Sequence, residues 1–416
     1  MASHRRRPRL AVGCVVAALA STLFSPAWAD PAPSFAQLLG LLEQAPATIE
    51  ASALADAAEA RARQADTRPN PIISIDVDGA LGTRDYSGFG NSETTFAVSQ
   101  NLELWGRRGA RVNVVRAEAG AVALQRDLTV INAAARLALV YAEAEAAERR
   151  AELAEESLNL TLADARAALI LVEEGREPLV RGIQAESEAA SARAVYDEAL
   201  AEREAAFARL MSMAMLNTPV TTIEVSLLDQ APLSTRTEAG GAPTVRVAEA
   251  ERYAAERRID LERASARPDV TANVGFRRYE AEDATAFTFG ISMPLPLFDR
   301  NRGNIEAAQA DLRAADARLA GVRQEALADR AAARARLAAS TSRVSAADSG
   351  VTAAEEAYRL SRIGFEAGRM SQLELRATRT ALVNARAAAV DARLARVRAE
   401  IDLARLDGRA PFQGAQ

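Results

Sequence analysis

The sequence predicts a mainly α-helical fold with a minor β component, built as an internal duplication. The first observation is a pattern repeated at an offset of 193 residues, because segment 96–107 matches segment 289–300. The second is that each of these segments is followed, at the same distance, by a glycine–arginine pair: Gly175–Arg176 and Gly368–Arg369. Self-similarity at a fixed spacing indicates two equal structural units. Each unit is expected to contain strands followed by a very long helix.

Residues 1–29 have the pattern of a secretory signal peptide. Arginines precede an apolar run at 10–24, and Ala27-Trp28-Ala29 is a small-x-small cleavage site. An N-terminal membrane anchor is the alternative, but the apolar run is too short to span a bilayer. Lipidation at Cys14 is not favoured, because most of the apolar run follows that cysteine. We therefore expect cleavage after Ala29.

Cleavage would remove both the only cysteine, Cys14, and the only histidine, His4. A mature chain without thiol or imidazole excludes disulfides, Cys/His zinc sites, cysteine nucleophiles and Ser-His-Asp triads. No compact carboxylate or glycine-rich phosphate motif is present, so neither an enzyme nor a cofactor is expected. The signal holds four of the 51 basic residues and none of the 56 acidic ones, which leaves a net charge of about −9. That charge argues against nucleic acid as a partner.

The first repeat is expected at residues 30–216. Ser34-x-x-Gln37 resembles a capping box that opens a helix, Pro46 ends that helix, and a second helix runs from about 48 to 66. A β-hairpin is expected at 72–103, because Ile73, Ile75 and Val77 alternate with polar residues, as do the residues around Phe96 beyond a polar loop.

A long helical hairpin is expected at 105–216. Its first arm is an Ala-rich stretch without proline, and seventy residues at a rise of ~1.5 Å would give a rod about 100 Å long. The tip lies near Gly175, a residue that can adopt positive φ and end a helix. The returning arm of about forty residues is too short to cover the rod. The short helix at 48–66 is expected to stack beyond its end and supply the missing length.

The second repeat is expected at 244–408 and follows the same plan. It contains a helix at about 244–265, a β-hairpin at 269–295 and a helical hairpin at 303–408 with its tip near 368. Residues 217–243 hold several prolines and glycines without helical periodicity, so they predict an irregular connector packed at the waist of the rods. The tail at 409–416 is expected to be disordered.

Each predicted hairpin has one apolar and one polar face. If the apolar faces meet lipid, four strands cannot close a barrel, and open edges in hydrocarbon cost several kcal/mol per unpaired group. The chain must then oligomerise, with two copies supplying eight strands and three supplying twelve. The polar side chains would line a wet lumen: Ser74, Asp76, Asn101, Asn273 and Ser292. The alternative is a sheet half-buried against a soluble core, but the rods leave little core for it to cover.

The element order and two motifs resemble the TolC-like outer membrane efflux proteins. The motifs are Thr48-Ile49-Glu50-Ala51 with Pro69-Asn70-Pro71, and the run from Met293 to Gly303. The second motif is most similar to the branch serving heavy-metal exporters of the cobalt–zinc–cadmium type. The resemblance implies a homotrimer with a twelve-stranded barrel in outer membrane lipid and a helical tunnel through the periplasm. It also implies a periplasmic adaptor (membrane fusion protein) and an inner-membrane pump of the RND type, which supplies the energy for a passive duct.

The resemblance also assigns roles to three groups of residues. The junction between barrel and tunnel would contain Leu104, Trp105, Pro294, Pro296 and Phe298, although the prolines would also simply end a strand. The tips would contact the adaptor through Gly175, Arg176, Glu177, Pro178, Leu179, Gly368, Arg369, Met370, Ser371 and Leu373; helix capping alone is their alternative role. Glu374 falls where relatives place a gate acid, and three copies would form a ring attracting cations. Arg181 is its equivalent in the first repeat, so the two could form an electrostatic latch.

Other functions on these residues stay open. A drug, small-molecule or protein-secretion duct would have the same fold, and a periplasmic adaptor or coiled structural spacer is a more distant alternative. No transition-metal site is expected in this subunit, since carboxylates alone favour hard cations. Substrate choice is therefore expected to lie in the pump and adaptor.

Overall fold

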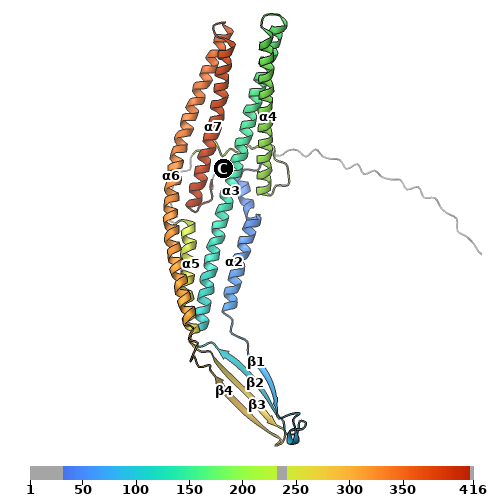
Figure 1. Cartoon of the computed structure of the whole chain (residues 1–416), viewed down its shortest axis with the longest axis vertical. Helices are drawn as coiled ribbons and strands as arrows, with labels where there is room; N and C mark the ends of the chain where they lie inside the picture. Colours follow the sequence, from blue (N-terminus) through green and yellow to red (C-terminus); the bar gives the residue numbers. More distant parts are fainter. Residues whose placement is uncertain (1–30, 232–240, 413–416) are drawn as a thin grey trace, which may run out of the picture.

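The structure, a computed structural model, describes residues 31–231 and 241–412 and is strongly elongated (Figure 1). A four-stranded sheet forms one end, and long helices extend from it to two separate tips at the other. The predicted signal peptide lies outside the described residues, as do part of the connector and the end of the tail.

Both repeats contain one helix, two strands and a long helical hairpin in the same order, and the first repeat adds a short helix at its start and two 3-10 turns. The first comprises α1 (Phe35–Leu41), the 3-10 turn η1 (Leu42–Gln44), α2 (Pro46–Ala65), β1 (Ile72–Asp78), the 3-10 turn η2 (Arg84–Tyr86), β2 (Glu93–Leu102), α3 (Arg107–Glu173) and α4 (Leu179–Ala214). The second comprises α5 (Pro243–Ser265), β3 (Val270–Tyr279), β4 (Ala284–Ser292), α6 (Arg302–Glu366) and α7 (Gln372–Leu406). Long helical hairpins with four strands and an internal duplication confirm the predicted fold class.

Local sequence signals account for several helix starts. Ser34 and Gln37 form the capping box of α1, in which the Ser34 hydroxyl accepts from the Gln37 amide. Pro46 and Pro243 both occupy the first turn of a helix, α2 and α5 respectively. Proline is well suited to that position, because its missing N–H would have had no partner in the helix. Pro46 therefore starts a helix as well as ending the segment before it.

The two hairpins join into one antiparallel sheet with the order β1-β2-β3-β4. In its register Ile75, Phe96, Phe276 and Phe287 lie side by side, and the adjacent row on the same face is formed by Ile73, Val98, Val274 and Phe289. Phe289 is 79% exposed and Ile73 is 75% exposed, so no described part of the chain covers these side chains. The opposite face carries the polar and small side chains, as the alternation predicted.

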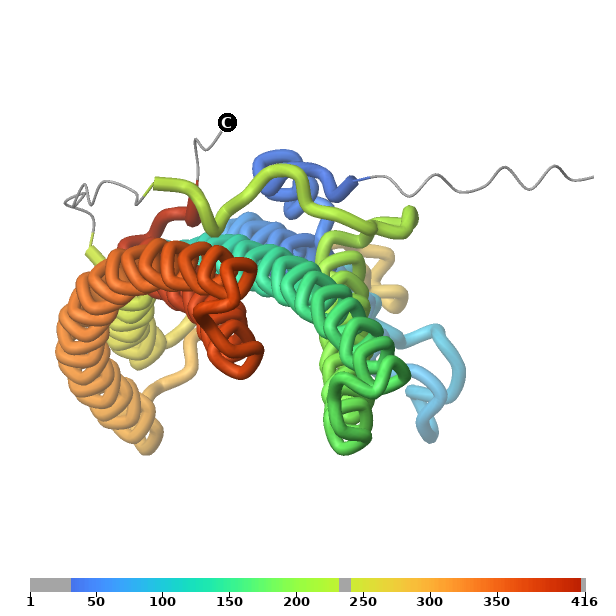
Figure 2. The backbone as a smooth tube through the Cα atoms, turned by 90° about the horizontal axis from the view of Figure 1, so that it is seen from above, coloured from blue at the N-terminus to red at the C-terminus, as the bar shows by residue number. Residues whose placement is uncertain are grey.

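Each long helix is accompanied by two shorter ones. In Figure 1, α4 lies along the tip half of α3 and α2 along its other half, while α7 and α5 accompany α6 in the same way. The repeats meet where α3 packs against α7 and α5. Seen along its length, the chain is a curved wall with α6 at one side and α4 at the other (Figure 2).

The hydrophobic core lies at the waist, where both repeats and the connector meet residues near Phe35 and Phe412. Its fully buried members include Leu137, Tyr141, Leu210, Leu227 and Phe412. The Tyr141 hydroxyl donates to the Val225 carbonyl at 2.7 Å, so the ring packs in the core while its polar atom holds the connector.

The disordered tail expected at 409–416 is wrong for its first four residues. Phe412 is 1% exposed and packs edge-on against Phe35, with the ring centroids 6.1 Å apart. Gly408 has φ of +78° and turns the chain out of α7 toward the waist. A buried aromatic side chain contributes enough apolar area to order this short segment. Residues 413–416 lie outside the described part.

Candidate functional site

The two tips have the same geometry. Both long helices end in a glycine with positive φ, +70° at Gly175 and +65° at Gly368. Arg176 donates its amide to the Leu171 carbonyl at 2.9 Å, and Arg369 donates to Gly364 at 2.8 Å. With a second bond from each glycine amide, these contacts form Schellman motifs, which satisfy the last carbonyls of a helix. The duplicated Gly–Arg pair therefore marks two matching helix ends.

Beyond each glycine the next helix starts within a few residues. Pro178 is the N-cap of α4, and Ser371 is the N-cap of α7. Leu179 and Leu373 are each 68% exposed, although they are large apolar residues. The remaining predicted tip residues lie in the turns between the helices, with Arg369 exposed and Glu177 and Met370 half-buried. Both tips thus present apolar and arginine side chains that no other part of the described chain covers.

Glu374 and Arg181 each have a partner in the turn that precedes their own helix. The Glu374 carboxylate accepts from the Ser371 amide and hydroxyl, both at 2.8 Å, and these bonds hold the pKa of Glu374 below its ordinary value. Arg181 lies 3.7 Å from Glu177. Among the described residues no ion pair joins Glu374 to Arg181, so a latch between them would have to form between different chains or after a rotamer change.

The sheet joins the long helices through tight turns. Trp105 and Gly106 have φ of +63° and +75°, and Asn301 has +56° at the start of α6. Pairing of β4 with β3 stops at Ser292, two residues before Pro294, as expected of residues that lack an N–H donor. Arg107 pairs with Asp269, which ties the start of α3 to the second repeat beside the sheet.

The junction side chains are unusually exposed for their type. Phe298 is 99% exposed, and Leu104, Trp105, Pro294 and Pro296 are also exposed. The sequence placed these residues between strand and helix, and the structure brings all of them to the same end of the helical part. No contact within the described chain accounts for their apolar character.

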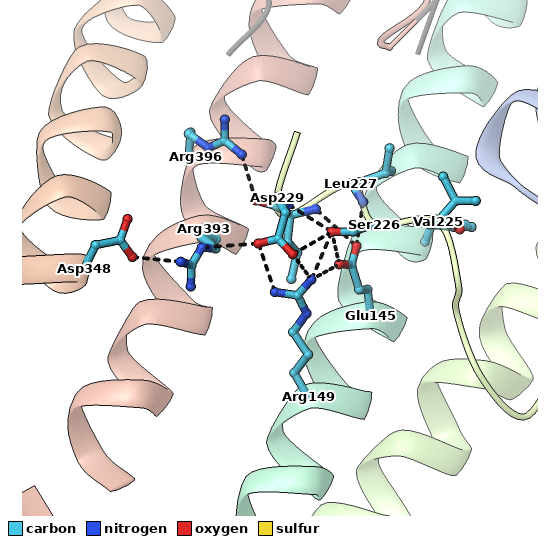
Figure 3. A network of polar contacts seen from close by, with 11 residues as sticks. Glu145, Arg149, Val225, Ser226, Leu227, Asp229, Asp348, Arg393 and Arg396 are labelled. Carbon is cyan, nitrogen blue, oxygen red and sulfur yellow. Dashed lines mark hydrogen bonds and ion pairs between the residues drawn. The ribbon is translucent and has the colours of Figure 1, made fainter. Parts of the chain in front are cut away.

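A polar network at the waist was not found by sequence reasoning (Figure 3). Its centre is Glu145 of α3, whose side chain is 3% exposed. The Glu145 carboxylate accepts from the amides of Leu227 at 2.8 Å and Leu228 at 3.1 Å, and from the Ser226 hydroxyl at 2.5 Å. Arg149, one turn further along α3, donates to the same carboxylate at 2.7 Å. A buried carboxylate thus binds the connector through its backbone.

The same segment reaches the second repeat. Asp229 pairs with Arg149 of α3 and lies 3.5 Å from Arg393 of α7, which in turn contacts Asp348 of α6 at 2.8 Å. Arg396 of α7 is buried and donates to the carbonyls of Leu228 at 2.8 Å and Gln230 at 2.7 Å. The segment 225–230, which we call the strap, therefore joins three helices from both repeats.

A family model for outer membrane efflux proteins matches residues 40–214 and 237–409, which are the two repeats without most of the connector. The chain belongs to the outer membrane efflux protein family. The observed duplication of a hairpin and a helical hairpin is therefore a property of the family and not of this chain alone.

Relatives of this efflux protein carry metals in their names. The nickel-cobalt-cadmium resistance protein NccC of Alcaligenes xylosoxydans is 39% identical over 75% of this chain and 72% of its own length. The nickel and cobalt resistance protein CnrC of Cupriavidus metallidurans is also 39% identical, over 77% and 76%. Among solved structures, the MtrE outer membrane channel of Neisseria gonorrhoeae has a TM-score of 0.75 at 22% identity and covers 92% of this chain and 91% of that one, which shows the shared fold.

The described residues contain neither a membrane-spanning helix nor a group of metal ligands. No helix in residues 31–231 and 241–412 is both long and apolar enough to cross a bilayer. Within the same ranges, no group of three or more carboxylate, imidazole or thiol side chains is arranged to hold a metal ion.

The strap gives the efflux protein a pH dependence. Hydrogen bonds from Arg149 hold the pKa of Asp229 below its ordinary value of 3.8. A carboxyl with a lowered folded-state pKa stabilises the fold above its unfolded value, and this contribution is lost as pH falls through the folded value. Asp229→Asn should therefore lower the melting temperature slightly near neutral pH, since half-exposed ion pairs contribute little. In melting curves recorded from neutral to acid pH, this difference should begin to shrink as pH falls to 3.8 and should vanish below the lower pKa of the folded state; a difference that does not change with pH would contradict the assignment.

Proposed function

We propose that this protein is the exit duct of a tripartite efflux system that exports heavy-metal cations across the outer membrane. The observation that carries the substrate class is the 39% identity to the nickel-cobalt-cadmium resistance protein NccC over 75% of the chain and to the nickel and cobalt resistance protein CnrC over 77% of it. The described geometry supports a duct, because the long helices form a curved wall that could enclose a tunnel (Figure 2).

The exposed apolar rows of the sheet support insertion into lipid. Four strands with free edges at β1 and β4 require partners, because unpaired backbone groups are too costly in hydrocarbon. Three copies would close a barrel of twelve strands, with Asp76 and Asn273 among the side chains facing its lumen. Residues 1–29 would act as the signal peptide that directs export and is then removed.

The tips are proposed to meet a periplasmic adaptor, and through it an inner-membrane pump of the RND type. Leu179 and Leu373 would supply apolar contact, while Arg176 and Arg369 would bind acidic or carbonyl groups of the adaptor. Glu374 from three copies would form the ring that narrows the pore, with Arg181 as its partner across chains. The exposed junction residues, Trp105 and Phe298 above all, would lie where barrel and tunnel meet and orient one on the other.

The substrate is tested by growth of a deletion strain. We expect loss of the gene to lower tolerance to nickel, cobalt, zinc or cadmium, and a plasmid carrying the wild-type gene to restore it, because the pump cannot discharge without its duct. The measurement is growth inhibition across these metals, copper and a panel of drugs. Sensitivity to drugs with unchanged metal tolerance would keep the duct and overturn the metal assignment.

A further inference from the structure

The duplication defines two contacts between repeats, of which a single chain makes only one. Within the chain, α3 of the first repeat packs against α7 and α5 of the second, and β2 pairs with β3. The corresponding surfaces of α6 and β4 on one side, and of α4, α2 and β1 on the other, have no such partner. Helices α6 and α4 lie at the two sides of the curved wall (Figure 2), and β4 and β1 form the two edges of the sheet (Figure 1).

The contact within the chain is a template for the missing one. Arg150 of α3 pairs with Asp391 of α7 at 2.5 Å. At the offset of 193 residues, Arg150 corresponds to Arg343 on α6, and Asp391 corresponds to Glu198 on α4. Both are exposed, and neither has an ion pair elsewhere in the described chain. The charges are thus kept, with the arginine on the long helix and the acid on the returning helix.

We propose that Arg343 of one copy pairs with Glu198 of a second copy, and that α6 packs against α4 of that copy as α3 packs against α7. The inference rests on the proposed ring of copies and goes beyond it by assigning the residues in contact. It does not depend on which substrate is exported. The face of α6 around Arg343 and the face of α4 around Glu198 both carry exposed small side chains at helical spacing: Ala339, Ala346 and Ala353 on α6, and Ala190, Ala194 and Ala201 on α4. Such side chains allow two helices to approach closely.

The strands supply an independent check of transferring the contact within the chain to a contact between two copies. The second strands are related by the offset of 193, and the first strands by the 199 residues that separate Arg68–Pro69 from Arg267–Pro268. Within the chain, Val98 pairs with Val274 and Phe96 with Phe276. Transferred to the free edges, these pairs become Ile291 with Ile75 and Phe289 with Val77. All four lie on the exposed apolar face, whereas a shift of one residue would oppose Phe289 to Asp76 or Asp78.

Cysteine cross-linking tests the pair directly. In a Cys14→Ser background the chain has no other cysteine. One chain with Arg343→Cys and one affinity tag is co-expressed with a chain carrying Glu198→Cys and a different tag. Isolated membranes are then treated with bismaleimidoethane. We expect a covalent product that carries both tags.

Two matched pairs control the reaction. A chain carrying both Arg150→Cys and Asp391→Cys should be cross-linked internally and should give no product of two chains, because that pair lies within one chain. Replacing Arg343→Cys by Thr341→Cys should abolish the product, since Thr341 faces the strap of its own chain beside Leu228 and Gln230. A product of equal yield from Thr341→Cys would overturn the proposed pairing.

Native electrophoresis of the same membrane extracts distinguishes failure of the proposed trimer from failure of the proposed contact between Arg343 and Glu198. A trimer that gives no product with both tags, while the internal control reacts, would overturn the proposed contact and leave the trimeric duct intact. A monomer would overturn the trimer and the contact together.

Discussion

Glu145→Ala should lower the free energy of unfolding by about 3–5 kcal/mol, the range measured when one partner of a buried charged network is removed. The substitution leaves the amides of Leu227 and Leu228 buried without an acceptor, and each orphaned group costs about 1–3 kcal/mol. Arg149 also loses its acidic partner on α3 and keeps only Asp229 of the strap. The measurement is thermal or denaturant unfolding of the purified protein in detergent, compared with wild type.

Glu143→Ala is the matched control for this variant. Glu143 lies on the same helix and pairs with Arg398 at 2.7 Å, but that arginine is half exposed. Removing a solvent-accessible pair should cost less than about 1 kcal/mol. Equal losses of stability in the two variants would show that the strap does not depend on the buried carboxylate.

Gly368→Pro should abolish complementation of the deletion strain while leaving expression and oligomeric state unchanged. Proline is held at φ near −65° and cannot adopt the +65° of Gly368, and it also lacks the N–H that donates to the Phe365 carbonyl. The turn between α6 and α7 must then rearrange, which displaces Arg369 and Leu373 from the positions proposed to meet the adaptor. The measurement is metal tolerance of the complemented strain, with native electrophoresis of its membranes.

Gly321→Ala provides the control within the same helix. Gly321 lies inside α6 with helical φ, and a Cβ there would have no atom within 4 Å, so the variant should complement fully. Wild-type tolerance in the Gly368→Pro strain would show that the tip turn is not needed for export. Loss of the oligomer in that strain would instead place the residue in assembly.

Local signals in the sequence were sufficient to predict the strands and the long helices. Alternation with period two predicted β1 to β4. Gly175 and Gly368 marked the C-terminal ends of α3 and α6, because positive φ is a property of the backbone at one residue. The capping box at Ser34 is equally local. Repetition of these signals at a constant offset determined the duplication and, through it, the relation between the two repeats.

Local sequence signals predicted only part of the candidate site. The tip and junction residues were located because they sit at element boundaries that the sequence marks. The strap was not, since Glu145 and Leu228 are 83 positions apart and nothing in either segment indicates the other. Arg396 and Glu400 have the spacing of an ordinary surface pair on a helix, yet both are buried at the waist.

The sequence by itself therefore determined which residues form strands and long helices, where the helices end, and that the plan occurs twice. Only the tertiary structure decided that β2 pairs with β3, that a buried carboxylate holds the strap, and that Phe412 returns to the core beside Phe35. The physical reason is that helix and strand formation depend on neighbours within a few residues. Burial and charge pairing depend on which surfaces meet, and that is set by the packing of segments remote in the chain.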